Sequence, residues 1–378
     1  MDNQVLLPTS EAEISEILTN AKVPLRVIGG GTRPVGQVEA DTALSTSALT
    51  GVTLYDPGAL TLVAKSGTPL AEIERVVAAE NQRLAFEPMD HRGLLGTLGT
   101  PTIGGVVAAN ISGPRRVQVG ACRDHLLGAR FIDGQGNIIK NGGRVMKNVT
   151  GYDLVKLMAG SHGTLGVLSE VSLKVLPQVE AVAIVMINGL TNEQAIAAMS
   201  RAMGSPYEVS GAAHLPDGLD GHAVTMLRIE GFEGSVAYRA DAVRALFADQ
   251  AGVQIETDPE SVEAAWRRVR DVEDFHEKAG DVWRISCVPR DAARLAEIAG
   301  GHIIFDWAGG LVWALTPSGT DLRASLGTFE GHATLVRSGP EVSAIAAFPP
   351  EPPLLAEISN GLRQRFDPRG LLNPGLMG

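Results

Sequence analysis

Ile28-Gly29-Gly30-Gly31-Thr32-Arg33-Pro34-Val35-Gly36 is the stretch on which the interpretation of this chain depends. A short apolar segment, residues 24–28, runs directly into consecutive glycines, so backbone N–H groups can approach an anion with no Cβ in the way. The spacing is not the Rossmann dinucleotide fingerprint, because the third glycine would fall at Pro34, and it is not a P-loop, because Gln37 stands where lysine is required. Taken alone, the loop indicates either an anion-binding turn or a plain tight turn.

Further glycine-rich segments follow in order along the chain. Residues 101–113, Pro-Thr-Ile-Gly-Gly-Val-Val-Ala-Ala-Asn-Ile-Ser-Gly, have the small side chains that suit a backbone lying against a planar ligand, or a helix packed closely on a sheet. The next is Gly151-Tyr152-Asp153-Leu154, followed by residues 160–167. The last lies in residues 366–375 and ends in Asn373-Pro374-Gly375.

Composition predicts a folded, soluble protein with more than one core. The chain has 378 residues, of which 44% are hydrophobic and 20% charged, so it can bury a core without difficulty. Its apolar runs are too short to cross a bilayer, and the start, MDNQVLLPTSEAEI, has neither the basic nor the apolar part of a secretory signal. Cys122 and Cys287 have no metal or redox spacing. We therefore expect a reducing, cytoplasmic setting and no membrane span.

The charge distribution divides the chain into two parts. The net charge of −11 argues against a nucleic-acid partner, because phosphate neutralisation needs a basic face. Residues 1–178 hold 16 Lys+Arg and 16 Asp+Glu, whereas residues 179–378 hold 16 and 27, so the second part carries the whole deficit. A neutral part within an acidic protein can accommodate an anion, although chance variation of the surface charges explains the imbalance equally well.

Local patterns predict the main elements. A capping box formed by Ser10 and Glu13 begins a helix that runs to about residue 20, and Thr68 caps a second helix that runs to about residue 80. Strands are expected over 60–64 and on both sides of the turn at 133–136. After residue 178, the strand candidates are residues 181–187, 222–229, 282–288, 302–307 and 311–315. Since helices separate these strands, we expect an antiparallel sheet with helices on one face.

In this order, the glycine-rich segments resemble those of the flavin-binding family of vanillyl-alcohol oxidase and p-cresol methylhydroxylase (PCMH). Within that family, the chain is most similar to the smaller FAD-binding subunits of bacterial glycolate oxidases. The resemblance implies an α+β fold: a two-subdomain PCMH-type FAD-binding domain at 1–178, an α+β cap domain with an antiparallel sheet and helices at 179–348, and a C-terminal helix and tail at 349–378 that return to the FAD domain.

The resemblance also implies a set of residues that bind FAD. Residues 29–33 match the pyrophosphate loop, the segment 151–167 matches the adenine and diphosphate side, and Asn373 matches a tail residue near the flavin ring. No histidine stands in the first loop, where relatives with a covalent flavin carry one, so the FAD is expected to be non-covalent. The full set is Gly29, Gly30, Gly31, Thr32, Arg33, Pro88, Met89, Thr102, Gly104, Gly105, Asn110, Gly113, Arg116, Gly120, Asp124, Gly151, Asp153, Leu154, Gly163, Thr164, Gly166, Val167 and Asn373.

The chain departs from the family where dehydrogenases of 2-hydroxy acids bind a metal. Those relatives carry His-x-Gly-Asp-Gly-Asn-x-His, but Trp307 and Ala314 stand here at the histidine positions, and Gly310 and Val312 replace the Asp and Asn. None of these side chains can ligate a divalent ion or accept a proton. We therefore predict no catalytic residue and no metal ligand in this chain.

The remaining polar residues give weaker signals. Arg33, Arg115 and Arg116 are candidates to stabilise a reduced flavin, since a guanidinium favours negative charge on the ring. His125 or His162 could contact a phosphate, whereas the other histidines show no metal spacing.

Three functions remain open at this point. In the first, the chain is the FAD-binding subunit of a multi-subunit glycolate oxidase that converts glycolate to glyoxylate. The resemblance implies a larger FAD-binding subunit and an iron–sulfur subunit as its partners, with any membrane association made through them, and gives this chain an electron-relay or structural role. In the second, it is a self-sufficient FAD-dependent 2-hydroxy acid dehydrogenase. In the third, it is a non-catalytic assembly subunit with a vestigial flavin site. The intact glycine loops argue against the third function, and the missing His and Asp argue against the second.

Overall fold

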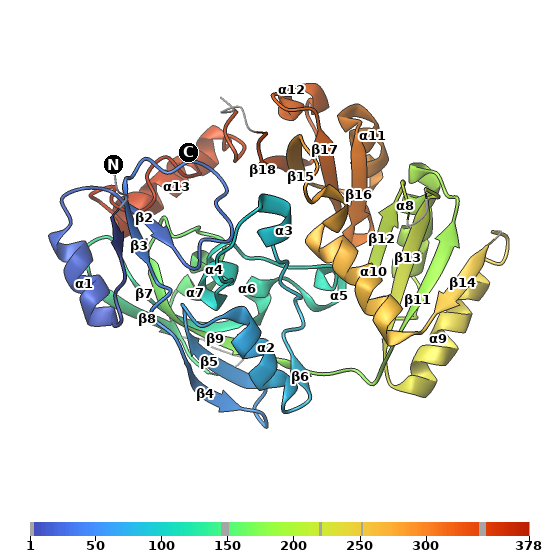
Figure 1. Ribbon diagram of the computed structural model, residues 1–378, viewed down its shortest axis with the longest axis horizontal. Coiled ribbons are helices and arrows are strands. Elements are labelled where there is room, and N and C mark those ends of the chain that lie inside the picture. Colours follow the sequence, from blue (N-terminus) through green and yellow to red (C-terminus); the bar gives the residue numbers. More distant parts are fainter. Residues whose placement is uncertain (1–3, 145–150, 219–220, 251, 340–344, 378) are drawn as a thin grey trace.

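The computed structural model describes residues 4–144, 151–218, 221–250, 252–339 and 345–377. Within these residues, a three-stranded and a five-stranded sheet lie on one side of the molecule, and an eight-stranded sheet lies on the other (Figure 1). No helix in the described ranges has the length and apolar character needed to cross a membrane. The mixture of helices with largely antiparallel sheets confirms the predicted α+β class.

The three-stranded sheet is parallel and has the order β1-β3-β2. Helix α1 packs against it through Ile14 and Leu18, which are fully buried. The predicted cap of α1 is present, since the Ser10 side chain accepts from the Glu13 N–H, but the Glu13 carboxylate binds Thr9 rather than Ser10. The elements are β1 (Val5–Leu6), α1 (Glu11–Asn20), β2 (Leu25–Ile28) and β3 (Thr42–Ser45).

The five-stranded sheet is antiparallel, with the order β4-β5-β9-β7-β8, and carries short helices on its core face. The predicted N-cap of α2 is wrong: Thr68 donates its hydroxyl to the Lys65 carbonyl, and Pro69 takes the cap position with no side-chain bond. The elements are β4 (Val52–Asp56), β5 (Thr61–Lys65), α2 (Leu70–Ala78), α3 (Arg92–Leu95), α4 (Ile103–Ala108), α5 (Arg116–Val119), α6 (Cys122–His125), β7 (Leu126–Ile132), β8 (Ile138–Gly142), α7 (Leu154–Met158) and β9 (Val167–Lys174); β6 (Gln82–Arg83) pairs separately with β10 (Leu176–Pro177).

The eight-stranded sheet is antiparallel and has the order β14-β11-β13-β12-β16-β17-β15-β18. Every strand predicted from the sequence after residue 178 is present in it; β12, β14 and β18 are additional. Its elements are β11 (Ala181–Asn188), α8 (Asn192–Met203), β12 (Gly211–Leu215), β13 (Val224–Gly231), α9 (Glu233–Leu246), β14 (Val253–Glu256), α10 (Pro259–Asp271), η1 (Glu273–Phe275), β15 (Asp281–Cys287), α11 (Pro289–Ala299), β16 (His302–Asp306), η2 (Trp307–Gly309), β17 (Leu311–Thr316), α12 (Leu322–Leu326) and β18 (Gly331–Arg337).

Alternation along these strands separates the two faces of the sheet. On β15, Trp283 and Ile285 face a core shared with α8, α9, α11 and α12, whereas Val282 faces the core of the first part of the chain. Helix α10 packs on the same face of the sheet as Val282, through Val262 and Trp266. The expectation of helices on one face only is therefore wrong, because the face turned toward residues 1–178 also needs apolar cover and α10 provides part of it.

The end of the chain returns to its beginning. Helix α13 (Pro353–Phe366) lies beside the small parallel sheet in Figure 1, and residue Leu25 of β2 pairs with Leu372. The backbone N–H of Leu25 donates to the Leu371 carbonyl, and that of Asn373 donates to the Leu25 carbonyl. These contacts confirm the predicted return of the tail. The domain boundaries at 178 and 348 stay predictions.

Candidate cofactor-binding site

A cavity of about 660 Å³ lies where the first glycine loop meets α4 and the tail. This volume falls within the range of about 300–1,000 Å³ that is usual for small-molecule sites. Most of its lining comes from the end of β2 with the loop that follows, residues 101–111, residues 161–168, and the tail residues Asn373 and Leu376. Single residues of other segments complete it: Thr46, Ser66, Met89 and His91. The sequence segments that share a glycine-rich character therefore meet at one place.

Glycine is required in this wall because the loops pack backbone against backbone. A Cβ on Gly30 would lie 1.6 Å from the Thr100 carbonyl oxygen, and one on Gly104 would lie 2.6 Å from Cβ of Ser66. Gly31 differs, since its φ is +72° and a Cβ there would meet no described atom within 4 Å. Gly30 and Gly104 thus allow the loops to come together, and Gly31 leaves the wall open toward the cavity.

The cavity is electropositive, and some polar atoms of its wall lack hydrogen-bond partners. Arg26 and Arg33 line it, and no Asp or Glu occurs among its lining residues in the described ranges. Two buried polar atoms of this wall, Arg26 Nε and Ser66 Oγ, have no hydrogen-bond partner among the described residues. Buried donors without partners are costly, so this wall suits a ligand that brings negative charge and hydrogen-bond acceptors.

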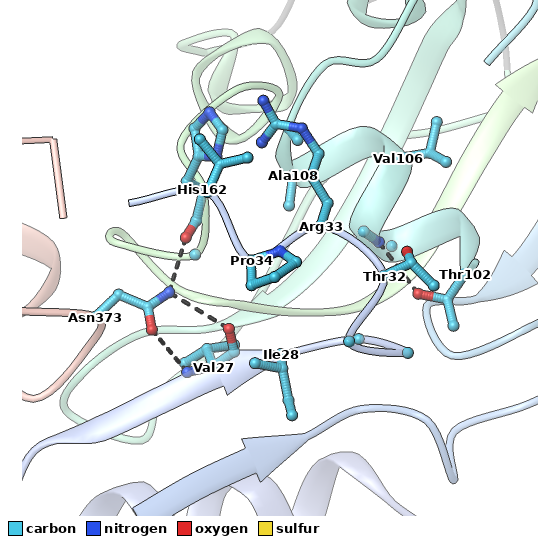
Figure 2. Close-up of a pocket in the computed structure, with 18 of the residues that line it drawn as sticks. Val27, Ile28, Thr32, Arg33, Pro34, Thr102, Val106, Ala108, His162 and Asn373 are labelled. Atoms are coloured by element: carbon cyan, nitrogen blue, oxygen red, sulfur yellow. Dashed lines mark hydrogen bonds between the residues drawn. The ribbon is translucent and has the colours of Figure 1, made fainter. Parts of the chain in front are cut away.

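Arg33 is the central charge of this wall. Its Nε donates to Nε2 of His91 at 3.2 Å, and burial lowers the pKa of the guanidinium to about 10. Burial, followed by the charge of Arg33, lowers the pKa of His91 and of His162 to about 3, so both imidazoles are neutral at physiological pH. In Figure 2 the side chains of Arg33 and His162 lie near each other on one side of the cavity. The two histidines thus provide neutral polar groups beside the positive charge of Arg33.

Asn373 joins the tail to the cavity wall. Its Oδ1 accepts from the Val27 N–H at 2.7 Å, and its Nδ2 donates to the His162 carbonyl at 2.8 Å and to the Val27 carbonyl at 3.5 Å (Figure 2). The residue is 2% exposed and has a φ of 47°, a left-handed conformation that asparagine tolerates better than most residues. One side chain therefore holds three segments of the wall together.

We expect Asn373→Ala to lower the free energy of unfolding by about 2 kcal/mol, because it leaves the Val27 N–H and the His162 carbonyl buried without partners. It should also lower the amount of cofactor retained on purification. Urea unfolding and the ratio of visible to ultraviolet absorbance measure these effects. The matched control is Asn81→Ala, an exposed asparagine with a φ of 52°. Equal losses in both variants would show that the Asn373 contacts contribute nothing.

About half of the residues predicted to bind FAD line this cavity. The structure brings together Gly29, Gly30, Gly31, Thr32, Arg33, Met89, Thr102, Gly104, Gly105, Gly163, Gly166 and Asn373. Thr102 also caps α4, since its hydroxyl accepts from the Gly105 N–H. Thr164 and Val167 are buried beside this group but are not lining residues. Whether each residue contacts FAD stays a prediction.

The other predicted residues lie outside this cavity and have local roles. Asn110 accepts from the Arg123 N–H, and Asp124 accepts from the Ala121 N–H at the start of α6. Asp153 caps α7 by accepting from the Lys156 N–H. The residues of the predicted set that do not line the cavity, besides Thr164 and Val167, are Pro88, Asn110, Gly113, Arg116, Gly120, Asp124, Gly151, Asp153 and Leu154.

Two of the weaker sequence interpretations are also resolved. Arg115 is not free to act on a ligand, because it forms ion pairs with Glu87 at 2.7 Å and Glu230 at 2.8 Å. His125 binds the Val119 carbonyl and does not line the cavity, whereas His162 does.

Sequence analysis did not identify Arg26, Ser66 or His91 as site residues, although all three line the cavity. For Arg26, the alternation of the strand Leu25-Arg26-Val27-Ile28 is a usable signal, because it places Arg26 on the face opposite the buried Leu25. For Ser66 and His91, no local pattern points to the site.

A second cavity of about 1160 Å³ lies between the first part of the chain and the eight-stranded sheet. Its buried arginines are already paired: Arg83 with Glu230 at 3.0 Å, and Arg228 with Glu87 at 2.9 Å. Carboxylates therefore balance these positive charges. Arg83 Nε and Trp266 Nε1 still lack hydrogen-bond partners among the described residues, so this larger cavity differs from the first in its paired charges and not in its unmet donors.

The segment at the predicted metal position carries no ligand set. Trp307, at the first histidine position, is buried, and its Nε1 donates to the Gly113 carbonyl at 3.0 Å. In the ranges that the structure describes, no group of three or more His, Cys, Asp or Glu side chains could hold a metal ion.

Comparisons with known proteins agree with this geometry. Residues 3–142 match a family model described as an FAD binding domain. Over 378 residues the chain is 33% identical to the glycolate oxidase subunit GlcE of Escherichia coli (strain K12), a match that covers 99% of this chain and 97% of that protein. It is 31% identical over 186 residues to the glycolate oxidase subunit GlcD of Bacillus subtilis (strain 168), covering 48% of this chain and 38% of that protein.

A similar fold occurs in a solved structure of an alkyldihydroxyacetonephosphate synthase. The TM-score is 0.71 at 16% sequence identity, and the match covers 98% of this chain and 76% of that chain. At this identity the similarity concerns the fold alone.

The residues present fit FAD. Its pyrophosphate is anionic, and the cavity has Arg26, Arg33 and exposed glycine backbone but no carboxylate in its described wall. Its ring system is flat, and side-chain-poor segments such as Gly104-Gly105 can lie close to it. The orphaned Arg26 Nε and Ser66 Oγ are donors that such a ligand would satisfy.

Proposed function

This chain belongs to the family of the glycolate oxidase subunit GlcE, an FAD-binding oxidoreductase family, and from that premise we propose that it is the FAD-binding subunit of a multi-subunit glycolate oxidase. The complex would convert glycolate to glyoxylate. In it, this chain would act as an electron relay or a structural subunit, while the substrate would be oxidised on a larger FAD-binding subunit and an iron–sulfur subunit would accept electrons.

One observation carries the non-catalytic part of this proposal. The chain has an electropositive cavity whose lining fits FAD, but the segment that holds ligands and a base in metal-dependent relatives has Trp307 and Ala314 instead. Neither side chain can take the proton that oxidation of a hydroxy acid releases. A chain with a cofactor site but no base at that position fits electron transfer better than turnover.

The residues of the cavity would serve the cofactor in distinct ways. FAD supplies electron transfer in two-electron or one-electron steps. Arg26, Arg33 and the glycine backbone would bind its anionic part, and the neutral His91 and His162 would add hydrogen bonds without a further charge. Asn373 would hold the tail against this wall.

The proposal is tested by purifying the chain alone and recording its visible spectrum before and after glycolate and an electron-accepting dye are added. We expect flavin absorbance that glycolate does not bleach. Bleaching by glycolate would instead support a self-sufficient 2-hydroxy acid dehydrogenase. A colourless protein that cannot be reconstituted with FAD would support the vestigial site.

The partners are tested by co-expression with the larger flavin subunit and the iron–sulfur subunit. We expect the complex to oxidise glycolate only when all subunits are present. Full activity of the two other subunits without this chain would contradict the proposed role.

A further inference from the structure

One edge of the eight-stranded sheet is left open beside the second cavity. Strand β11 pairs with β13 over its whole length, but with β14 only from Ile184 to Ile187. Because β14 is the last strand on this side, residues 181–183 have no neighbouring strand there among the described residues. Alternate residues of a strand direct their N–H and C=O groups to opposite sides. At least one of these three residues therefore presents an unpaired backbone donor and acceptor at the edge.

The second cavity runs along this open edge. Residues 181–183 line it together with Ile255 of β14 and Thr257, where the chain leaves β14 for α10. Its volume of about 1160 Å³ exceeds the range of about 300–1,000 Å³ that is usual for small-molecule sites. A cleft of this size beside an open strand can hold an extended segment of polypeptide. We name this cleft the edge groove.

Helices cover both sides of the edge groove and give each side an apolar wall. Val236 and Ala240 of α9 belong to the core on one face of the sheet, and Val262 and Trp266 of α10 belong to the core on the other. In Figure 1, α9 and α10 lie on opposite sides of β11. The side chains of an added strand would point alternately to these two faces, so both sets would meet apolar surface.

The edge groove also has hydrogen-bond donors without partners. Nε of Arg83 and Nε1 of Trp266 are buried and form no hydrogen bond with the described residues, and both residues line the groove. The carbonyl groups of an extended segment are acceptors for such donors. The backbone of a peptide can therefore satisfy both the edge of β11 and these two side chains.

The charges of the edge groove indicate the kind of segment that it fits. Each arginine that lines it forms an ion pair with a carboxylate of the described residues: Arg83, Arg115, Arg228, Arg267 and Arg270. By contrast, four exposed carboxylates of its lining form no ion pair within the described ranges: Glu74, Glu180, Glu233 and Glu263. The groove thus has a negative rim, which is complementary to lysine or arginine.

Two exposed aromatic side chains flank the edge groove. Phe232 and Tyr238 are 73% and 70% exposed, and they are next in the chain to the lining residues Glu233 and Ala237 of α9. Aromatic residues are enriched at protein–protein contacts. Their position favours a protein rather than a small molecule as the occupant of the groove.

We propose that the edge groove receives an extended basic segment of a partner subunit, which pairs with β11 as an added strand. The segment has apolar residues within the groove and lysine or arginine at its rim. Added strands of this kind gain affinity from main-chain hydrogen bonds and specificity from the pockets for their side chains. The inference rests on the proposed function, since it needs the partner subunits, and it adds the surface and the chemistry of the contact.

The test uses the three co-expressed subunits, with an affinity tag on this chain, and measures the partner protein retained per mole of this chain as salt is raised. Glu180→Lys and Glu263→Lys reverse charges at the rim, and Ala237→Trp fills the groove from α9. The matched controls are Glu297→Lys, on the exposed surface of α11, and Ala264→Trp, on the exposed part of α10 outside the groove.

We expect Glu180→Lys, Glu263→Lys and Ala237→Trp to retain less than about a tenth of the partner protein that the parent retains, and the controls to retain as much as the parent. The three variants should keep their FAD and their melting temperature, because the substituted side chains are exposed. In the parent complex, at least one amide of residues 181–183 should exchange its hydrogen more slowly than in the chain alone.

Full retention of the partners by the three variants would overturn the inference and leave the proposed function standing. So would unchanged hydrogen exchange at residues 181–183 in a complex that does form. Loss of FAD or of thermal stability in the variants would also overturn it, because the effect would then arise within this chain. A parent chain that retains no partner would overturn both the inference and the proposed function.

Discussion

Gly30→Ala is expected to abolish FAD binding. The new Cβ would lie 1.6 Å from the Thr100 carbonyl oxygen, and the adjoining Gly99 already leaves no room, since its own Cβ would lie 1.8 Å from the Gly30 carbonyl oxygen. Backbone cannot yield as a flexible side chain does, so the two loops must separate. Because residues 29–33 and 101–105 form adjoining parts of the cavity wall, their separation removes the site.

The measurement is the flavin absorbance per mole of purified protein, after an excess of FAD has been added and removed by gel filtration. The control is Gly143→Ala, where a Cβ would meet no described atom within 4 Å and the φ is not positive. Gly31→Ala adds a second comparison, because its Cβ also meets no protein atom and only the left-handed backbone is strained, by about 1 kcal/mol. Normal FAD content in Gly30→Ala would refute the packing argument.

Arg228→Met is expected to lower the free energy of unfolding by about 3–5 kcal/mol, the usual effect of breaking a buried ion pair from one side. The Arg228 side chain is 1% exposed, binds Glu87 at 2.9 Å and lies 3.6 Å from Glu230. It also lies over the ring of Trp266 at 4.3 Å. Its loss leaves the buried carboxylates of Glu87 and Glu230 incompletely neutralised, at the contact between β13 and the first part of the chain.

Acid should reduce the difference in the free energy of unfolding between Arg228→Met and the parent. Burial acts to raise the pKa of Glu87, but the charges of Arg228 and Arg115 outweigh it, and the pKa is lowered; Glu230 behaves likewise. A lowered pKa gives stability that is present above the unfolded value of about 4.3 and is lost as the pH falls through the folded value. Urea unfolding at pH 7 and below pH 4 measures this change.

The control for Arg228→Met is Arg244→Met, which removes an exposed pair with Asp241 whose side chains are 53% and 61% exposed. We expect it to change stability by less than about 1 kcal/mol. Comparable losses of unfolding free energy in both variants would show that the buried ion pairs of Glu87 and Glu230 contribute no more to stability than an exposed pair.

The sequence was informative where chemistry follows from local composition. The glycines at 29–31 and 104–105 predicted bare backbone, and the structure places them around one cavity. The tail residue Asn373 was predicted through the family resemblance, and it binds Val27. The strands after residue 178 were predicted from short apolar runs, which are a local feature of the sequence, and the structure contains these strands.

What the sequence did not predict depends on contacts between distant segments. Arg115 and Arg116 are neighbours in the chain, yet one is paired with Glu87 and Glu230 and the other stacks on Trp307. No local pattern separates them, because the partners come from β13, η2 and the segment between β6 and α3. The side on which α10 packs was also missed, since an amphipathic helix does not indicate which face of a sheet it covers.

The link between Val27 and Asn373, 346 residues apart, also orders events during synthesis. At about 5–20 residues per second, roughly 17–70 seconds pass between the emergence of β2 and that of the segment that completes its edge. The intervening eight-stranded sheet has its own core and can form in that interval. The wall of the cavity is therefore complete only after the tail has been synthesised, and we expect tight binding of FAD to follow that step.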